Sequence, residues 1–318
     1  MKKGVPGGAS GALRGIAAAL TAGCLWGTVG VFVRVFTGLG YSPLSIVFVR
    51  MSIAFALTFV ALLVTGRRNL LHVRLRDLWC FIGTGVSSAI LLNLFFSLSV
   101  LMNSLSLAAI LISTAPVFVV ILSAPIFGER ITAVKVQALI LCFAGCALTS
   151  GVVSGGPVFS AGGVIIGLLA GLGYAMYSLF TRAALNRGYD SLTVNVYSFG
   201  IGALACAPFA NFALIAATVS DAPGRMAVLL VAHTLCTSLF PYILYTYSMK
   251  YLDTGKASIL VSVEPVAATF FGLALYSETL SAVSVAGIVL VLFAIALLTL
   301  PRGLSEVPGI LRSVFRRG

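Results

Sequence analysis

Ten apolar runs, each about twenty residues long and separated by short polar turns, determine what this chain can fold into. The hydrocarbon core of a bilayer is about 30 Å thick, so a helix needs roughly 20 apolar residues to cross it. Only helices and closed barrels satisfy all backbone groups inside lipid. We therefore predict an all-α membrane protein with ten transmembrane helices, at residues 13–35, 43–65, 77–100, 105–127, 133–152, 161–183, 191–216, 226–249, 255–276 and 281–300.

Composition agrees with this prediction and excludes several other classes of protein. Sixty per cent of the residues are hydrophobic and nine per cent are charged, which leaves too little polar surface for a soluble domain of 318 residues. The net charge of +12 does not indicate nucleic-acid binding, because the basic residues lie in short turns and form no single patch. The six cysteines include no CxxC pair, so no disulfide framework, metal site or cofactor is predicted.

The second half of the chain repeats the first. With a shift of 149 residues, Ala108, Ile110, Leu111, Ser113, Pro116, Val117 and Glu129 match Ala257, Ile259, Leu260, Ser262, Pro265, Val266 and Glu278. With a shift of 148, Leu20, Gly23, Phe32, Arg34, Gly40, Tyr41 and Leu44 match Leu168, Gly171, Phe180, Arg182, Gly188, Tyr189 and Leu192. We expect repeats at 13–152 and 161–300, an N-terminal segment at 1–12, a linker at 153–160 and a basic tail at 301–318.

The distribution of Lys and Arg predicts how the helices are oriented. With the N-terminus in the cytoplasm, seventeen basic residues fall on the cytoplasmic side, while Arg34 and Arg225 fall on the other. The protein is therefore expected in the cell membrane with both termini in the cytoplasm, where anionic lipid of the inner leaflet attracts the basic tail. Five helices are an odd number, so the second five must run inverted relative to the first. The predicted fold is a 5+5 inverted repeat.

Small residues recur four apart on one face of the first and sixth runs. They are Gly23 and Gly27 in the first, and Gly167 and Gly171 in the sixth. Such stripes let helix backbones approach closely. They are interpreted either as static packing or as surfaces along which two bundles move.

Several motifs resemble the drug/metabolite transporter superfamily, in its ten-helix EamA branch. They are Leu25-Trp26-Gly27, Phe48-Val49-Arg50, Pro116 with Phe127-Gly128-Glu129-Arg130, and Glu264-Pro265 with Ser277-Glu278. The resemblance covers residues 13–300 and implies an inverted bundle with a central cavity that moves small metabolites, often outward. Because the fourth run has Ala115-Pro116 where the ninth has Glu264-Pro265, any carboxylate role is confined to one half.

Glu264 is the strongest candidate for a functional residue. It lies about 15 Å from either end of its run at 1.5 Å per residue. A charge at that depth costs roughly 2.5–3.5 kcal/mol on insertion scales, so the carboxyl must be protonated, paired or in contact with water. Pro265, like Pro116, removes a backbone donor and opens its helix locally. Glu264 is predicted to bind a proton, a substrate amine, or each in turn. The alternative is a buried acid that bonds to a neighbouring helix.

Arg50 is the one cation well inside a run, at nearly the depth of Glu264. Three roles are open to it: an ion pair with Glu264, a partner for an anionic substrate group, or a side chain that reaches outward to the interface. Glu129 and Glu278 each end a long run, and capping or headgroup contact accounts for them.

Other polar and aromatic side chains gather in a few runs. They are Asn93, Tyr174, Tyr177, Asn195, His233, Tyr242, Tyr245 and Ser262. Aromatic walls with a few hydrogen-bonding tips suit a small organic ligand. Each of these residues has helix packing as its alternative role.

Together these features predict a secondary transporter. Its substrates are expected to be small organic metabolites, amino acids or related amines, exported by alternating access and driven by protons or by the substrate gradient. The alternatives are an intramembrane enzyme and a scaffold that transports nothing. The enzyme is disfavoured because the chain has no HExxH or Gly-x-Ser-x-Gly and its four aspartates lie at run ends or in loops. The expected partners are a small-molecule substrate and the bilayer, and the sequence leaves the oligomeric state open.

Overall fold

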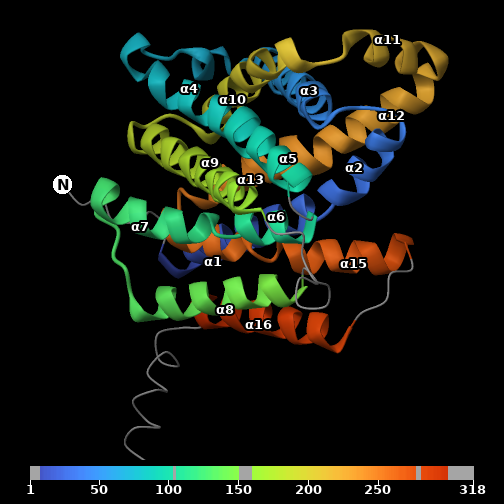
Figure 1. Cartoon of the computed structure of the whole chain (residues 1–318). Helices are drawn as coiled ribbons and strands as arrows, with labels where there is room; N and C mark the ends of the chain where they lie inside the picture. Colours follow the sequence, from blue (N-terminus) through green and yellow to red (C-terminus); the bar gives the residue numbers. More distant parts are fainter. Residues whose placement is uncertain (1–7, 103–104, 150–159, 277–280, 300–318) are drawn as a thin grey trace, which may run out of the picture.

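The structure, a computed structural model, describes residues 8–102, 105–149, 160–276 and 281–299, and helices are its one type of regular structure there (Figure 1). The first half contains α1 (Gly8–Trp26), α2 (Val29–Gly38), α3 (Pro43–Val64), α4 (Leu78–Val86), α5 (Leu92–Met102), α6 (Leu105–Ile112), α7 (Ala115–Phe127) and α8 (Ala133–Thr149). The second half contains α9 (Ala161–Asn186), α10 (Ser191–Cys206), α11 (Phe212–Asp221), α12 (Pro223–Thr234), α13 (Phe240–Ser248), α14 (Thr254–Val261), α15 (Glu264–Tyr276) and α16 (Ala282–Thr299).

Nine helical segments in the described ranges are long and apolar enough to cross a membrane. The remaining predicted segment, 133–152, forms α8, whose 17 residues span about 25 Å at 1.5 Å per residue. It runs beside α16, and the two pack through glycines: a Cβ on Gly145 would lie 2.6 Å from Val291 Cγ2, and one on Gly287 would lie 2.6 Å from the Gly145 carbonyl oxygen. Such close approach is typical of helix pairs in lipid.

Local sequence signals account for where the helices begin. The side chain of Ser42 accepts a hydrogen bond from the Ser45 N–H, with Pro43 in the first turn of α3. The side chain of Asp253 accepts from the Lys256 N–H and caps α14 in the same way. Gly40 and Gly188, equivalent in the repeat, both adopt a left-handed backbone, with φ of 85° and 88°.

The loops that carry most of the Arg and Lys meet at one end of the bundle, which we call the basic end. There Arg187 bonds to Asp77 at 3.1 Å, and Lys250 bonds to Asp190 at 2.7 Å. Burial opposes the charge of Asp190, but the Lys250 ammonium and the Leu192 N–H hold the pKa of Asp190 below its ordinary value. This carboxylate is therefore charged at neutral pH.

The two halves cross the bundle in opposite directions. The beginning of α1 lies at the basic end, because Gly15 packs against Tyr251 and Leu252. The sixth span, α9, instead finishes at that end, where Arg187 meets Asp77. The predicted all-α membrane fold with a 5+5 inverted repeat is therefore confirmed. Which end faces the cytoplasm stays a prediction.

The seventh span is shorter than predicted. Helix α10 ends at Cys206, a 3₁₀ turn follows at Ala207–Phe209, and α11 begins as a separate short helix. Pro208 cannot donate a backbone hydrogen bond to continue α10. The side chain of Asn211 then caps α11 by accepting from the Leu214 N–H at 3.1 Å.

Within the described residues, three spans are broken near their middle, and two more contain a π-helical turn. The breaks separate α1 from α2, α6 from α7 and α14 from α15. The last two fall at repeat-equivalent positions, after Ile112 and after Val261. The π turns, Ser87–Leu91 in the third span and Leu235–Leu239 in the eighth, are 148 residues apart. Wide turns of this kind often occur at functional sites.

Both predicted glycine stripes contact a broken helix of the opposite half. A Cβ on Gly23 would lie 2.8 Å from the Val261 carbonyl oxygen, and one on Gly27 would lie 2.6 Å from Ala267 Cβ. In the other half, a Cβ on Gly167 or Gly171 would lie 2.5 Å from Leu111 Cδ1 or 2.7 Å from Thr114 Oγ1, respectively. The stripes therefore lie at contacts between the two halves.

Some predicted features lie outside the described residues. They are most of the N-terminal segment 1–12, the linker 153–160 apart from residue 160, the tail 301–318, and Glu278.

Candidate functional site

A cavity of about 590 Å³ lies where the broken spans of the two halves meet. Its walls come from the junctions α1–α2, α6–α7 and α14–α15, together with α3, α5, α8, α9, α13 and the first π turn. The lining continues along α2 to Arg34 and along α15 to Gly272, away from the basic end (Figure 1). The volume is that of a site for a small organic molecule.

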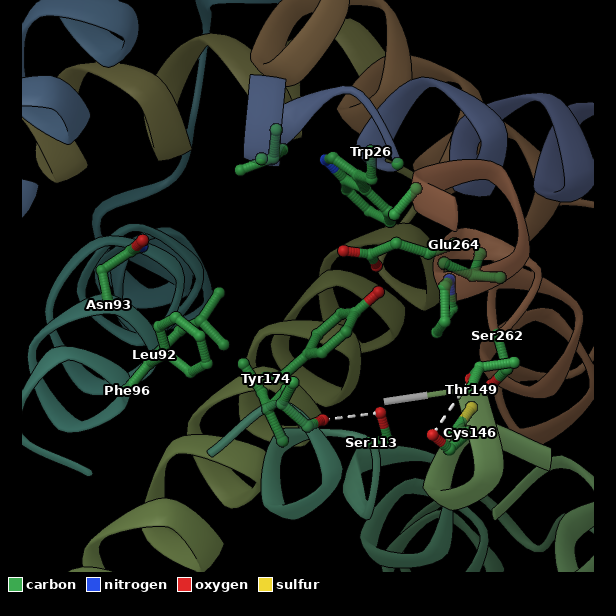
Figure 2. Close-up of a pocket in the computed structure, with 18 of the residues that line it drawn as sticks. Trp26, Leu92, Asn93, Phe96, Ser113, Cys146, Thr149, Tyr174, Ser262 and Glu264 are labelled. Atoms are coloured by element: carbon green, nitrogen blue, oxygen red, sulfur yellow. Dashed lines mark hydrogen bonds between the residues drawn. The ribbon is translucent and has the colours of Figure 1, made fainter. Parts of the chain in front are cut away.

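Glu264 lies at the first position of α15, on the cavity wall. Figure 2 shows its carboxylate pointing into the open space below Trp26, toward the hydroxyl of Tyr174. No hydrogen bond or ion pair from the described residues reaches this carboxylate. The break in the helix follows from Pro265, which has no N–H for the carbonyl of Val261. The predicted role as an acid bonded to a neighbouring helix is therefore not what the described residues show.

Arg50, in the middle of α3, is buried but also lines the cavity. Its Nη1 donates to the carbonyl oxygen of Thr237 at 3.3 Å, and its Nε has no partner. No acidic side chain among the described residues pairs with it, so neither the ion pair with Glu264 nor the outward-reaching position is observed. The role that the structure leaves is that of a cation facing the cavity.

Thr237 lies in the second π turn and organises this part of the wall. Pro241, four residues later, has no N–H to donate to the Thr237 carbonyl. That carbonyl accepts from Arg50 and, at 3.2 Å, from the indole Nε1 of Trp26. One backbone oxygen therefore fixes both a charged and an aromatic side chain of the site.

Four aromatic side chains form the cavity wall on one side of the Glu264 carboxylate. Trp26 meets Tyr174 and Tyr242 edge to face, with ring centroids 6.0 and 5.4 Å apart, and Tyr177 packs against Tyr242 at 5.2 Å. Ring faces next to a carboxylate suit an organic cation, because both attract positive charge.

The opposite wall comes from the third span. Asn93 and Phe96 of α5 face the cavity across from Glu264 (Figure 2). The amide of Asn93 donates to the Ser88 carbonyl of the first π turn at 2.7 Å. Ser113, Ser262 and Thr149 gather where the broken helices meet α8 (Figure 2). Asn93 and these three hydroxyl-bearing residues can form hydrogen bonds with a ligand, and none of them carries a charge.

Ten of the sixteen predicted residues line the cavity. They are Glu264, Arg50, Asn93, Tyr174, Tyr177, Tyr242, Ser262, Pro116, Pro265 and Gly27.

The other six lie behind it. Asn195 donates to the Ser191 carbonyl, His233 is enclosed by Phe32 and Phe36, and Tyr245 bonds to Ser178. Gly23, Gly167 and Gly171 pack against broken helices outside the lining.

Sequence reasoning missed several residues of the lining as candidate site residues. Trp26, Ser88, Cys146, Thr149 and Ser258 all contribute to it. The signal for Trp26 was present, since a tryptophan beside a glycine in the middle of a span is unusual for lipid contact. The small polar residues gave no comparable signal.

Polar contacts join the two halves at the basic end, below the cavity. Glu129 follows α7 and accepts from the Thr254 N–H at 2.8 Å and the Gly255 N–H at 3.2 Å. The capping predicted for Glu129 is present, although at the N-terminus of α14 in the other half. Lys135 of α8 pairs with Asp253 at 2.7 Å. We call these contacts the inter-half latch, formed by Glu129, Lys135, Asp253, Thr254 and Gly255.

A largely buried arginine supports the latch from the second half. Arg182 of α9 donates to the Thr254 hydroxyl at 2.8 Å, to the Met249 carbonyl at 2.6 Å, and to the Leu252 carbonyl. Its guanidinium lies 3.7 Å from Glu129. Arg182 therefore links the N-terminus of α14, which Glu129 caps, to the loop that precedes it.

Comparison with known proteins agrees with this architecture. Two proteins of Archaeoglobus fulgidus, each named an uncharacterized transporter, are 27% and 28% identical over 267 and 276 residues, covering 82% and 86% of this chain and 91% and 92% of their own lengths. One crystal structure shares the fold with a TM-score of 0.72 and 18% identity, over 91% of this chain and 96% of that one.

The family assignment rests on a match in each half. The model of the EamA-like transporter family matches residues 13–151 and again residues 161–300. These ranges cover most of the chain, and the resemblance drawn from the sequence motifs is confirmed. The chain belongs to the EamA-like transporter family.

Proposed function

We propose that this protein is a secondary transporter that exports small amine-bearing metabolites, amino acids in particular, with Glu264 as the site for the amine. The observation that carries the proposal is the Glu264 carboxylate, which lines the cavity and has no hydrogen-bond or ion-pair partner among the described residues. A charge at this depth needs neutralising. A substrate ammonium group and a proton would neutralise the carboxylate alternately.

The substrate class follows from what faces Glu264. Arg50 lines the same cavity, and its Nε has no partner among the described residues. The rings of Trp26 and Tyr174 also line the cavity and pack against each other. A molecule with an ammonium group and a carboxylate matches the two charges. Guanidinium groups bind carboxylates with strong, oriented hydrogen bonds.

Alternating occupation by proton and substrate supplies the coupling. When the substrate leaves, a proton neutralises Glu264 and lets the cavity close without an exposed charge. Transport would then exchange protons for substrate, and an opposing proton gradient would drive export. The names of the two archaeal relatives support the transporter class, but they do not specify a substrate.

The test replaces Glu264 with Gln in protein reconstituted into liposomes. The amide keeps the shape of the side chain but cannot bind a proton or attract an ammonium group. We expect amino-acid flux to fall at least tenfold and its dependence on the pH gradient to disappear, since charged hydrogen bonds contribute about 1.5–3 kcal/mol.

The matched control is Asp221→Asn, which removes a carboxylate from the exposed end of α11. It should transport like the unaltered protein. Unaltered flux and pH dependence in Glu264→Gln would refute the proposed role of Glu264. Absence of flux in the unaltered protein for every amino acid and amine tested would instead refute the substrate class.

A further inference from the structure

Three arginines and a tryptophan line a hollow at the basic end, separate from the cavity. The hollow lies between Arg74, Arg76, Asp77, Trp79 and Arg187. Three positive charges face one negative charge there, so the hollow is strongly cationic.

The acidic residue of this group is already fully engaged. Asp77 is buried, and it accepts from Arg187 Nε at 3.1 Å and from the Tyr189 hydroxyl at 2.7 Å. The side chains of Arg74 and Arg76 form no ion pair or hydrogen bond with the described residues. Two of the three arginines are therefore free to bind an anion from outside.

The third arginine is held in position by its neighbours. The Arg187 guanidinium lies 4.7 Å from the centre of the Trp79 ring, and its Nη1 donates to the Ala183 carbonyl at 3.0 Å. Trp79 is braced on its other side by Phe180, at 5.8 Å. Nη2 of Arg187 has no acceptor in the described part of the chain. A preformed guanidinium of this kind suits a phosphate oxygen.

An apolar strip leads from the hollow along the outside of the bundle. Leu75, Trp79 and Ile82 are 84%, 45% and 50% exposed, and they lie at the start of a candidate membrane span. A tryptophan at that depth is typical of the boundary between headgroups and acyl chains. The cationic hollow and the apolar strip thus meet at the headgroup level.

We propose that this hollow binds the phosphate group of an anionic phospholipid, with Arg74, Arg76 and Arg187 around the phosphate and an acyl chain along Leu75, Trp79 and Ile82. The apolar strip favours a lipid over a soluble phosphate, because a free anion would use only the arginines. The site is independent of the transport cavity and of its substrate.

The chain suits a fluorescence test, because Trp26 and Trp79 are its two tryptophans. The variant Trp26→Phe leaves Trp79 as the single reporter. We would reconstitute it in phosphatidylcholine vesicles that contain a small fraction of phosphatidylglycerol or phosphatidylcholine with brominated chains. Bromine quenches only tryptophans that it contacts. We expect stronger quenching by brominated phosphatidylglycerol than by brominated phosphatidylcholine at equal mole fraction.

Two double variants in the Trp26→Phe background decide whether the hollow is responsible. Arg74→Gln with Arg76→Gln should lower the relative affinity for phosphatidylglycerol about fivefold for each arginine removed. Arg67→Gln with Arg68→Gln removes the same charge from the same connection but outside the hollow, and should keep the preference. Circular dichroism would verify that both remain helical.

Three outcomes would overturn the proposal. Equal quenching by the two brominated lipids in the Trp26→Phe protein would show that no anionic headgroup binds there. An equal loss of the preference for phosphatidylglycerol in the two double variants would show that the lipid is attracted by the overall surface charge and not by the hollow. Full retention of the preference for phosphatidylglycerol in the Arg74→Gln, Arg76→Gln protein would show that the arginines of the hollow do not bind the headgroup.

Discussion

At the scale of single residues, three charged side chains line the cavity, and two of them, Arg50 and Glu264, differ in how firmly they are held. Arg50 is anchored to the Thr237 carbonyl, whereas the Glu264 carboxylate has no partner among the described residues. The arginine can therefore serve as a fixed reference point for one end of a substrate. The carboxylate can change its protonation state or partner without breaking a structural bond.

Replacing Arg50 with Gln tests the anionic end of the substrate separately from the amine end. We expect the affinity for an amino acid to fall about tenfold or more, because hydrogen bonds to charged groups contribute about 1.5–3 kcal/mol. The affinity for the corresponding amine, which lacks the carboxylate, should stay within about threefold. Ligand-induced shifts in melting temperature of the purified protein measure both.

The control for Arg50 is Arg225→Gln, which removes an exposed cation at the start of α12. Equal weakening of the amino acid and the amine in Arg50→Gln would contradict the assignment, since it would show a general loss of structure.

Glu264 and Arg50 could be found from the sequence because charges within apolar runs are rare and costly. Asn195 and His233 were predicted with them but lie behind the cavity. The difference is one of direction. In a soluble helix the apolar face shows which side is buried, but here lipid and protein interior are both apolar, so the sequence does not reveal which face turns toward the cavity.

At the scale of helices, the glycine stripes and the broken spans belong to one arrangement. Gly27 lies against the first turn of α15, directly behind Glu264, while Gly171 lies against the equivalent break between α6 and α7. A shift of one half relative to the other would change these contacts.

Gly27→Ala tests whether this contact is only static. The added methyl group would lie 2.6 Å from Ala267 Cβ and 2.8 Å from the Ala268 nitrogen, so α1 and α15 must separate. Overpacking of this kind typically costs about 1–3 kcal/mol. We expect a lower melting temperature and a maximal transport rate, per folded molecule, reduced several-fold.

Gly38→Ala is the matched control, because nothing lies within 4 Å of its added Cβ. A Gly27→Ala protein that loses stability but keeps its full transport rate would show that the stripe is static packing. Both measurements are made on the same preparations.

The helical spans were predictable because lipid permits little else, but their irregularities were only partly so. The prolines predicted the breaks after Ile112 and Val261. The break after Trp26 has no proline beside it. The first π turn has no marker either, because one extra residue in a turn leaves the apolar pattern unchanged, whereas Pro241 follows the second. The end of α10 was placed too late because Pro208 lies in a run that stays apolar beyond it.

At the scale of the whole molecule, the two ends of the bundle differ. The cavity lining extends toward the end opposite the basic end, while the inter-half latch closes the basic end. Access from the basic end requires the latch to open, since it joins α7 and α8 of one half to α14 of the other.

Glu129→Gln weakens the latch without removing its side chain. We expect a cysteine placed at Ser258, on the cavity wall, to react several-fold faster with a polar thiol reagent added from the basic end. The variants are built after replacing the six native cysteines. The accessibility of this cysteine is measured as the rate of labelling in membrane vesicles of each orientation. The experiment does not require the substrate to be known.

Lys250→Gln is the control for the latch. It removes the ion pair with Asp190 at the same end, but both partners of that pair belong to the second half. It should leave the labelling unchanged. If the two variants behave alike, the effect belongs to the surface charge of that end and the latch has no gating role.

The matching π turns also bear on how the repeat arose by duplication. Ser87–Leu91 and Leu235–Leu239 occupy the same place in the two halves, as do the breaks after Ile112 and Val261. A single origin in an ancestral gene half this length, before it doubled, accounts for each pair. The break after Trp26 has no counterpart in the continuous α9. The position equivalent to Glu264 in the other copy is Ala115, which has no carboxylate. Those two features distinguish the copies, so at least one copy changed at each of these positions after the doubling.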